Sequence, residues 1–412
     1  MILTPDGRYV FSPQSLKSFE DQGGVTSKGR LKVSTFESIF FNTFQYGKET
    51  DVWDEATASG GAGTFDANLN AIAMSVTGTA GSQVIRQTFN AQRYNPGRSS
   101  TLSFAVRLTT PTTGVRRRFG LFDENNGFYF EDGGDGDYYC VLRSSASGTM
   151  QETKVGRNQW NGDRLTGYWP SWITADPTAL QLVNFDYEWY GAGQIKVGWI
   201  IDGEVRIIHT FSSANRQALP WCSTPFLPIR LELTNVAGTA GTHYMYQGSN
   251  SLISEGMTDK LGIAQNITSP TAGTNITTGT FHPVLSIRLK STALKGIVIP
   301  RFYQCATLDN TNIFYRLTRN PTLTGASWTN MPDANSFSQY DTSATATTGG
   351  TIIDSGFITA NSNSGQIKLD EKTIYQIGRS SLGTISDILS LSIESTSANK
   401  KGIASMTWIE QR

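Results

Sequence analysis

Hydrophobic and polar residues alternate most regularly between positions 185 and 211, in the stretch FDYEWYGAGQIKVGWIIDGEVRIIHTF. Phe185 and Tyr187 fall on one face of this pattern, and Asp186 and Glu188 fall on the other. A period of two residues indicates β-strands. The Asp-Gly pair inside the stretch favours a type I′ hairpin turn, because both residues tolerate positive φ. The stretch therefore predicts a meander of three strands.

Alternating runs recur along the rest of the chain, and Gly, Asn and Asp separate them in the manner of tight turns. In the first part of the chain they cover residues 84–89, 101–108, 118–122, 127–131, 138–143, 229–234, 243–248 and 251–255. A second series covers residues 284–290, 297–304, 313–317, 352–358, 388–393 and 403–409. Residues 151–178 read as a long irregular loop. No run has a helical period, so the fold class is all-β.

The two series predict two β-sandwich domains of jelly-roll-like architecture, preceded by an N-terminal arm. We expect the arm at residues 1–50 and the larger sandwich at 51–256. A segment rich in Thr, Ser, Asn and Gly predicts a linker at 257–280, and the smaller sandwich then occupies 281–412.

Aromatic residues are concentrated near the end of the arm, in STFESIFFNTFQYGKE at positions 34–49. We interpret Phe36, Phe40, Phe41 and Phe44 as a docking segment that packs on a neighbouring molecule. The alternative is a strand or short helix that closes the core of its own domain.

Composition and charge exclude several classes of partner. Lys plus Arg and Asp plus Glu both number 34, so no net field attracts nucleic acid or an anionic membrane. The start MILTPDGRYVFSP lacks the basic and apolar regions of a signal peptide, so we expect synthesis in a cytoplasm. Three scattered cysteines fit neither a disulfide framework nor a zinc site.

No catalytic site is predicted, and no cofactor. Asp186 and Glu188 share a strand face, as the carboxylates of laminarinase-type glycosidases do. That arrangement requires a third acid further along the strand, but the next position on this face is Tyr190. A solvated or Arg-paired strand face is the simpler interpretation. The three histidines lie far apart, and no P-loop, dinucleotide fingerprint or nucleophile motif is present.

An acidic loop at positions 131–137 contains the candidates for a metal site. Asp132, Asp135 and Asp137 could supply oxygen ligands to Ca²⁺, although their spacing is not that of an EF-hand. Asp-Gly turns also occur without metal, and the run of arginines at 116–118 could pair with this loop instead.

A loop rich in aromatic residues offers a candidate site for sugars. Trp160, Tyr168, Trp169 and Trp172 could stack on the rings of a glycan, as lectin-like domains do. Such rings also commonly cover the end of a sandwich core.

Several segments together resemble a family of virion structural proteins of tailed bacteriophages from aquatic environments. These segments are RRRFGLFDENNGFYFE (116–131), NGDRLTG (161–167), the meander, STPFLPIRLEL (223–233), VLSIRLK (284–290), LTGASWTNM (323–331) and YDTSATATTGGT (340–351). The IDGE hairpin is also similar to the strand pair of laminin-G and legume-lectin-like jelly rolls.

The resemblance implies a non-enzymatic virion component: a capsid decoration, neck, fibre or baseplate element. Its expected partners are further copies of itself, as a trimer, and other virion proteins. The alternative is a receptor-recognition module that binds a glycan on the host surface. Neither nucleic acid nor a membrane is an expected partner.

Overall fold

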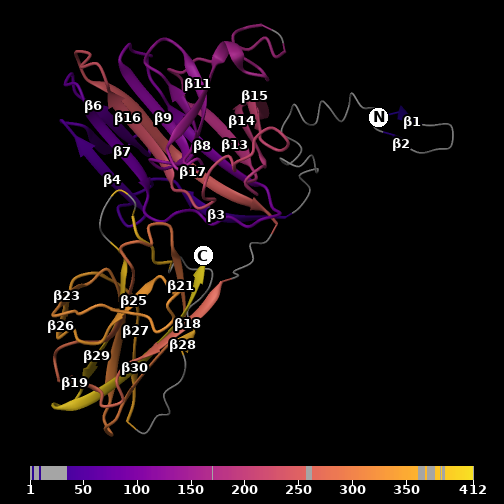
Figure 1. The fold of residues 1–412 in the computed structure, drawn as a ribbon. Helices are drawn as coiled ribbons and strands as arrows, with labels where there is room; N and C mark the ends of the chain where they lie inside the picture. The colour runs from indigo at the N-terminus through magenta and orange to yellow at the C-terminus, as the bar shows by residue number, and fades with distance from the viewer. Residues whose placement is uncertain are drawn as a thin grey trace. The chain divides into compact units, whose positions relative to one another are not determined.

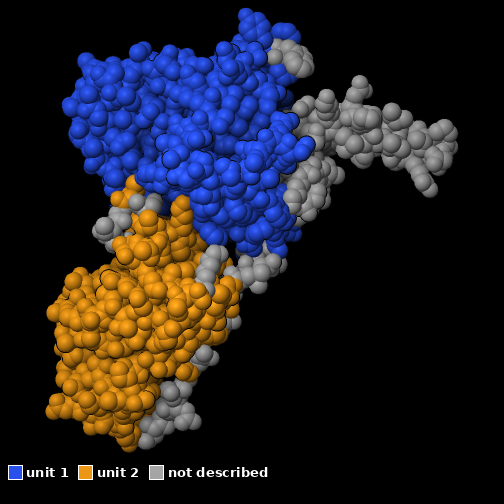
Figure 2. Space-filling model, in the orientation of Figure 1, with its two compact units in different colours: residues 1–88, 92–259 blue, residues 89–91, 260–412 orange. Residues whose placement is uncertain are grey.

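The chain is built almost wholly from antiparallel β-strands, which confirms the all-β class (Figure 1). The computed structural model describes residues 35–168, 170–256, 262–360, 376–380, 382 and 386–411, and three short strands at 2–3, 9–10 and 367–368. The chain divides into two compact units, residues 1–88 with 92–259 and residues 89–91 with 260–412 (Figure 2). Among the described residues the one helical element is a single 3₁₀ turn, Arg157–Gln159.

The first unit contains two large sheets with one core between them. The seven-stranded sheet has the order β12 (Gln151–Gly156), β11 (Tyr138–Ser144), β10 (Gly127–Asp132), β9 (Val115–Phe122), β16 (Ile229–Asn235), β7 (Ser82–Thr88) and β4 (Trp53–Ala58). The eight-stranded sheet has the order β15 (Glu204–Ser212), β14 (Gln194–Ile201), β13 (Gln181–Tyr187), β8 (Ser100–Arg107), β17 (His243–Glu255), β6 (Ala71–Val76) and β5 (Ala62–Asp66). Its remaining strand, β3 (Phe36–Asn42), pairs with the second half of β17.

The predicted meander is confirmed as β13, β14 and β15, which are neighbours in the eight-stranded sheet. Asp202 and Gly203 have φ values of 54° and 79°, which is the backbone that a type I′ turn requires. A β-bulge between Val197 and Gly198 shifts the register of β14 and β15. Phe185 and Tyr187 point into the core, as their alternation predicted.

Aromatic rings dominate the core of the first unit. Phe104, Phe119 and Phe185 are fully buried, and their ring centroids lie 5.3 to 6.1 Å apart in edge-to-face pairs. Full burial of one such side chain contributes about 1.5–3 kcal/mol to the free energy of unfolding. Because these rings come from both sheets, they hold the sandwich together.

A buried arginine connects the two sheets at the end of the sandwich where β3 lies. Arg86, on β7, donates from Nε to Oε1 of Gln247 on β17 at 2.9 Å. Its two other nitrogens donate to Glu55 Oε2 at 2.5 Å and to the carbonyl of Lys48 at 3.0 Å. The segment before β4 is therefore bonded to Arg86, which itself joins the two sheets.

The second unit is a smaller sandwich. Its five-stranded sheet has the order β18 (Ile263–Thr268), β30 (Lys400–Gln411), β21 (Ile297–Thr307) and β28 (Ile367–Lys368), and β19 (Thr274–Ile276) also pairs with β30. Its six-stranded sheet has the order β24 (Thr329–Asn330), β25 (Ser338–Asp341), β20 (His282–Leu289), β29 (Ile388–Ser395), β22 (Ile313–Arg319) and β27 (Thr351–Ile358). A two-stranded ribbon, β23 (Thr322–Thr324) and β26 (Ala346–Thr348), completes the unit.

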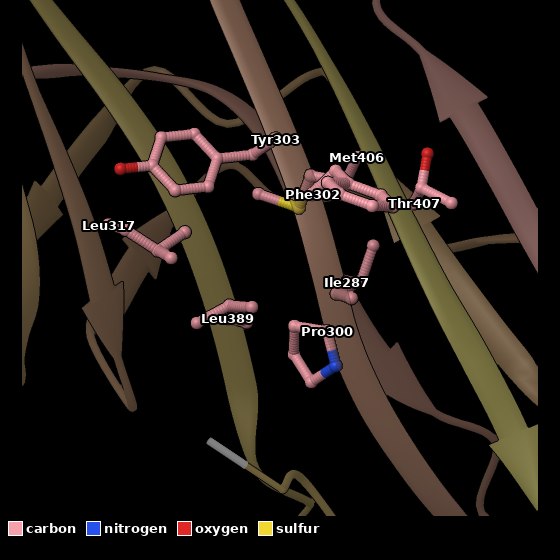
Figure 3. A pocket seen from close by; sticks show the side chains of 8 residues that line it. All are labelled: Ile287, Pro300, Phe302, Tyr303, Leu317, Leu389, Met406 and Thr407. Carbon is pink, nitrogen blue, oxygen red and sulfur yellow. The ribbon is translucent and has the colours of Figure 1, made fainter. Parts of the chain in front are cut away.

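The core of the second unit contains a small gap with mostly apolar walls (Figure 3). Ile287, Leu317, Leu389 and Met406 surround it, and the space does not admit a water molecule. Such a gap reflects imperfect packing, because it is too small for a ligand.

The structure differs from the sequence prediction at two expected boundaries. Residues 36–50, expected in a separate arm, contain β3 and belong to the first unit. The expected linker, 257–280, contains β18 and β19; its residues 257–261 lie outside the described part of the chain. The expected irregular loop at 151–178 begins with a regular strand, β12, whose residues are mostly exposed. The strands β12, β18 and β19 are largely polar, so they lack the alternation that marks a half-buried strand.

Candidate functional site

The four phenylalanines of the expected docking segment separate into two exposed and two inward side chains. Phe36 and Phe41 are 64% and 66% exposed. Phe40 is half-buried, with its ring 5.9 Å from that of Trp53. Phe44 is fully buried, also 5.9 Å from Trp53. Phe44 therefore belongs to the core of its own unit, which corrects the prediction that it docks on another molecule.

A β-bulge in β3 brings the two exposed rings to the same side. Phe36 and Phe41 are five residues apart, so a regular strand would place them on opposite faces. The register shifts between Ser38 and Phe40, where Ile39 has no partner of its own on β17. Phe41 then pairs with Ser251, and Phe36 pairs with Glu255. Both rings lie on the face of the eight-stranded sheet that is turned away from the core, which we call the outer face.

The outer face also carries a row of aliphatic side chains. Leu182 on β13 pairs with Ala105 on β8, and Ile200 on β14 pairs with Val205 on β15. Val183 pairs with Trp199, so the residues next to them, Leu182 and Ile200, lie side by side on the two strands. Leu182 is 41% exposed, and the others are half-buried. The outer face thus carries an aliphatic row on hydrogen-bonded strands, in addition to the two exposed rings on β3.

The carboxylates of Asp186 and Glu188 also belong to the outer face, but they are only 2% and 1% exposed. This corrects the expectation of a solvated strand face. Asp186 pairs across the strands with Lys196 and accepts a hydrogen bond from Ser99 Oγ at 2.6 Å. Ser99 ends the segment that leads into β8, so this connection contributes to the cover over the carboxylates. A substrate in solution has no direct access to them.

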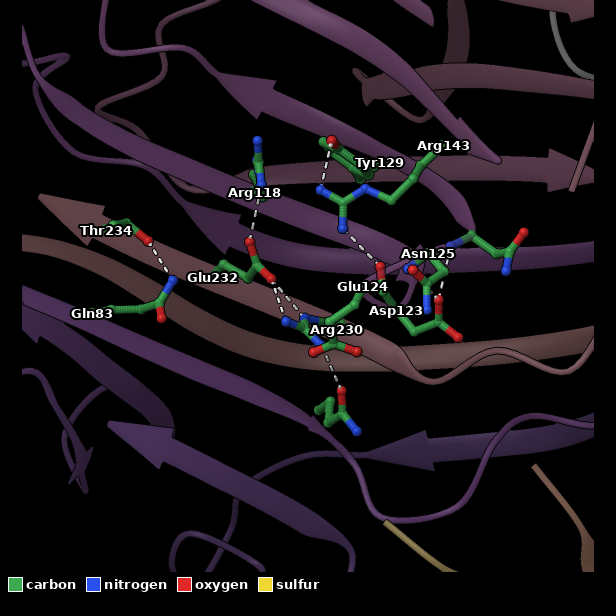
Figure 4. Close-up of polar contacts among 12 residues, drawn as sticks. Gln83, Arg118, Asp123, Glu124, Asn125, Tyr129, Arg143, Arg230, Glu232 and Thr234 are labelled. Atoms are coloured by element: carbon green, nitrogen blue, oxygen red, sulfur yellow. Dashed lines mark hydrogen bonds and ion pairs between the residues drawn. The ribbon is translucent and has the colours of Figure 1, made fainter. Parts of the chain in front are cut away.

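The outer side of the seven-stranded sheet carries a second group of charged residues (Figure 4). Arg118 donates to Glu131 at 2.5 Å and to Glu232 at 3.3 Å. Glu232 also accepts from Arg230 Nε at 2.7 Å. Burial alone would raise the pKa of Glu232, but Arg230 and Arg118 outweigh burial and lower it. A carboxylate held ionised in this way is unsuited to act as a general acid near neutral pH.

Arginine side chains lie over the aromatic rings of the same surface. The guanidinium carbons of Arg143 and Arg230 each lie 5.5 Å from the ring centroid of Phe122. Those of Arg118 and Arg143 lie 5.2 and 5.1 Å from the centroid of Tyr129. These stacked contacts fix the side chains and leave both rings fully covered. The rings are therefore unavailable for stacking on a sugar.

The three candidate calcium ligands do not converge. Asp132 is buried in an ion pair with Arg117, at 2.7 Å. Asp135 accepts from the hydroxyl of Tyr139 at 2.7 Å and from the backbone N–H of Asp137 at 3.1 Å. Among the described residues no three His, Cys, Asp or Glu side chains are grouped so that they could hold a metal ion. Pairing of the arginine run with the acidic loop, the other interpretation, agrees with the structure.

The aromatic loop separates its candidate sugar ligands. Trp160 is 5% exposed, and its indole N–H donates to the carbonyl of Val155 at 3.1 Å, so it is a core residue. Tyr168 and Trp172 are 72% and 68% exposed. Trp169 lies outside the described residues. Only Tyr168 and Trp172 of the described candidates can meet a ligand.

A small hairpin holds the two exposed rings. Thr166 and Thr174 form a β-bridge, and the N–H of Gly167 donates to the carbonyl of Ile173 at 2.9 Å. The N–H of Trp172 donates to the carbonyl of Tyr168 at 3.0 Å. These hydrogen bonds hold Tyr168 and Trp172 near each other.

No protein-family model matches the chain, and no curated protein matches it. A glycoside hydrolase family protein from Mycobacterium thermorestibile is 12% identical, with 52% of this chain and 99% of that chain covered and a TM-score of 0.37. A glycoside hydrolase family 16 endo-glucanase from Bacteroides ovatus is 10% identical, with 52% and 99% covered and a TM-score of 0.34. A pseudo β-1,3-glucanase of Mycobacterium tuberculosis is 10% identical, with 52% and 98% covered and a TM-score of 0.36. Similarity at this level does not identify what this chain binds or does.

The described residues contain no helix that is long and apolar enough to cross a membrane.

Proposed function

We propose that the chain is a non-enzymatic structural component of a tailed-phage virion, which assembles through the outer face of its eight-stranded sheet. The observation that carries this proposal is the exposure of Phe36 and Phe41 on a strand that is hydrogen-bonded into the sheet. Burying each ring in a contact would contribute about 1.5–3 kcal/mol. Exposed apolar residues grouped on one rigid face are typical of surfaces that associate.

The state of the carboxylates supports a non-enzymatic role. Asp186 and Glu188 are buried, and Glu131 and Glu232 are held by arginines. Hydrolysis of a glycosidic bond requires two accessible carboxyl groups, of which one carries a proton near neutral pH. The two groups of carboxylates do not offer that arrangement. The proposal takes the virion setting from the sequence resemblance alone.

Replacement of both exposed rings tests the proposal. The variant Phe36→Ser/Phe41→Ser should fold with an unchanged melting temperature but fail to enter particles when it replaces the parent chain during infection. The matched control is Tyr46→Ser, because Tyr46 is 95% exposed but lies beyond β3. Normal incorporation of the double variant would contradict docking through this face.

Glycan binding by the aromatic hairpin is a second candidate function. Trp172 has a φ of 63°, a left-handed backbone that destabilises a non-glycine residue by roughly 1–2 kcal/mol. A strained backbone that presents an exposed indole beside an exposed phenol ring is typical of a binding loop. A glycan array with the purified chain should then give hits that Trp172→Ala abolishes and Tyr46→Ala does not. An array without hits would refute this function and leave the structural role intact.

A further inference from the structure

The last strand of the six-stranded sheet in the second unit has an unpaired side. In the part of the chain that the structure describes, β27 pairs with β22 alone. Its other side presents backbone C=O and N–H groups that can bond to a further strand. One of these groups, the N–H of Ser355, donates to Asp354 Oδ1 at 2.8 Å within the strand and would exchange that bond on pairing. Unprotected strand edges are sites at which another chain adds to a sheet.

Two phenylalanines make this edge apolar. Phe357 on β27 lies directly opposite Phe314 on β22, on the face turned away from the core. Phe357 is 69% exposed, and Phe314 is 44% exposed. The next pair on the same face is Ser355 with Arg316. A large ring and a small hydroxyl therefore alternate along the outer side of the edge strand.

The devices that normally prevent edge pairing protect the first half of β27. The register shifts between Leu317 and Thr318, so Ile353 has no partner of its own and bends the strand. The one charged residue of the strand, Asp354, turns inward and accepts a hydrogen bond from the hydroxyl of Tyr303. After it the strand reads Ser-Gly-Phe-Ile, without lysine, proline or a further charge. Residues 355–358 are left as an uncharged stretch of the edge.

We propose that β27 pairs with β27 of a second copy of this chain, antiparallel and centred on Gly356. This register places Ser355 of each copy opposite Phe357 of the other copy. A twofold axis then passes through the two glycines, and the two six-stranded sheets become one continuous sheet. Because a dimer results, the pairing differs from the trimer expected from the sequence.

Side-chain sizes favour this register. Each Phe357 ring would meet a serine directly and the other Phe357 diagonally, at a separation that aromatic side chains can bridge. Gly356 has no side chain at the centre, and a Cβ there would lie 2.5 Å from the hydroxyl oxygen of Tyr315. No two like charges oppose each other, because each Asp354 remains on the core side with Tyr303. The edge is therefore complementary to itself.

A disulfide trap tests the register in the full-length chain. Ser355→Cys and Phe357→Cys are prepared as separate variants, each in the Phe36→Ser/Phe41→Ser background, so that contacts through β3 do not contribute. Oxidation of the mixture should give a covalent dimer, while each variant alone should remain monomeric. Facing residues in antiparallel strands have Cα atoms about 4.5–5.5 Å apart, within disulfide range. A covalent dimer from Ser355→Cys alone, or none from the mixture, would overturn the proposal.

Light scattering tests the pairing without introduced cysteines. In the same background, the chain should have twice its monomer mass of 45.0 kDa at tens of micromolar. Phe357→Lys should reduce it to a monomer, because a lysine protects a strand edge. Ile352→Lys is the matched control, since Ile352 is 50% exposed on the same strand but lies before the bulge. A monomeric parent, or a dimer that survives Phe357→Lys, would refute the proposal.

Discussion

Replacing Phe44 with alanine removes a ring that holds the segment between β3 and β4 on the first sandwich. Phe44 is fully buried, its ring lies 5.9 Å from that of Trp53, and the guanidinium of Arg86 lies 5.8 Å from its centroid. Its backbone N–H donates to Glu49 Oε1 at 3.1 Å, so the backbone there is fixed as well. The surroundings can therefore collapse only partly into the space that the ring vacates.

The expected loss has two parts. Removing a fully buried phenylalanine side chain and leaving a cavity lowers the free energy of unfolding by about 3–5 kcal/mol. The lost cation–π contact with Arg86 adds about 2 kcal/mol at most, because the pair is buried but its separation is close to the limit of about 6 Å for such contacts. We therefore expect the first unit of Phe44→Ala to be about 4 kcal/mol less stable than that of the parent. Phe41→Ala, the control on the same segment, should change stability by less than about 0.5 kcal/mol, as exposed positions do.

Calorimetry is the suitable assay, because each of the two units can unfold in a transition of its own. The transition of the first unit should move to lower temperature in Phe44→Ala, while that of the second unit stays in place. Chemical denaturation then converts the shift into a free energy. If Phe44→Ala and Phe41→Ala unfold alike, the assignment of Phe44 to the core is wrong.

Three further predictions concern buried and acidic groups. Arg117→Met leaves Asp132 without its ion-pair partner, so it should lower the free energy of unfolding by about 3–5 kcal/mol in urea titrations. The double variant Arg117→Met/Asp132→Leu should recover most of this stability. If the double variant is as unstable as Arg117→Met alone, the explanation is wrong. Burial lowers the pKa of His209 from 6.5 to about 4, so the unfolded chain binds the proton first and stability falls as the pH decreases through this range. Between pH 7 and 5 the parent should lose up to about 2 kcal/mol more than His209→Gln, and parallel pH profiles would refute this. Added Ca²⁺ should leave the melting temperature unchanged, because the carboxylate of Asp132 is already paired with Arg117. A rise of several degrees would show that Ca²⁺ binds the folded chain and would contradict this expectation.

Local patterns explain the parts of the fold that the sequence predicts well. The meander follows from alternation and from the Asp-Gly turn, both of which act between neighbours in the chain. The pairing of Arg118 with Glu131 follows from the hairpin that joins β9 to β10, because a short turn sets the register of every later pair. The sequence therefore places these charged groups beside each other without knowledge of the rest of the fold.

Contacts between distant segments explain what the sequence does not reveal. Asp186 looks solvated in a strand pattern, but Ser99, from a connection far away in the sequence, bonds to it. Phe36 and Phe41 face the same way only because Ile39 forms a bulge, and no residue pattern in the segment marks that bulge. Residues 151–156 form β12 at a sheet edge, where exposed polar side chains carry no periodic signal.

The place of Phe36 and Phe41 in the fold also depends on contacts between distant segments. Phe36 becomes part of an apolar surface because β3 lies beside β17, more than 200 residues later in the chain. Their concentration in the sequence predicts these rings as docking groups, and two of the four, Phe36 and Phe41, are exposed as that prediction requires. The aliphatic row on β13 and β14 has no signature of its own in the sequence, because its members alternate as ordinary strand residues do.

Immunogold labelling of purified particles tests the central claim most directly. If the chain is the virion component that we propose, an antibody against it should label intact phage particles at one repeated position, and the Phe36→Ser/Phe41→Ser variant should abolish that label. The particles should also contain the chain in a fixed ratio to the other virion proteins. A chain that accumulates in infected cells but is missing from purified particles would contradict the proposed structural role.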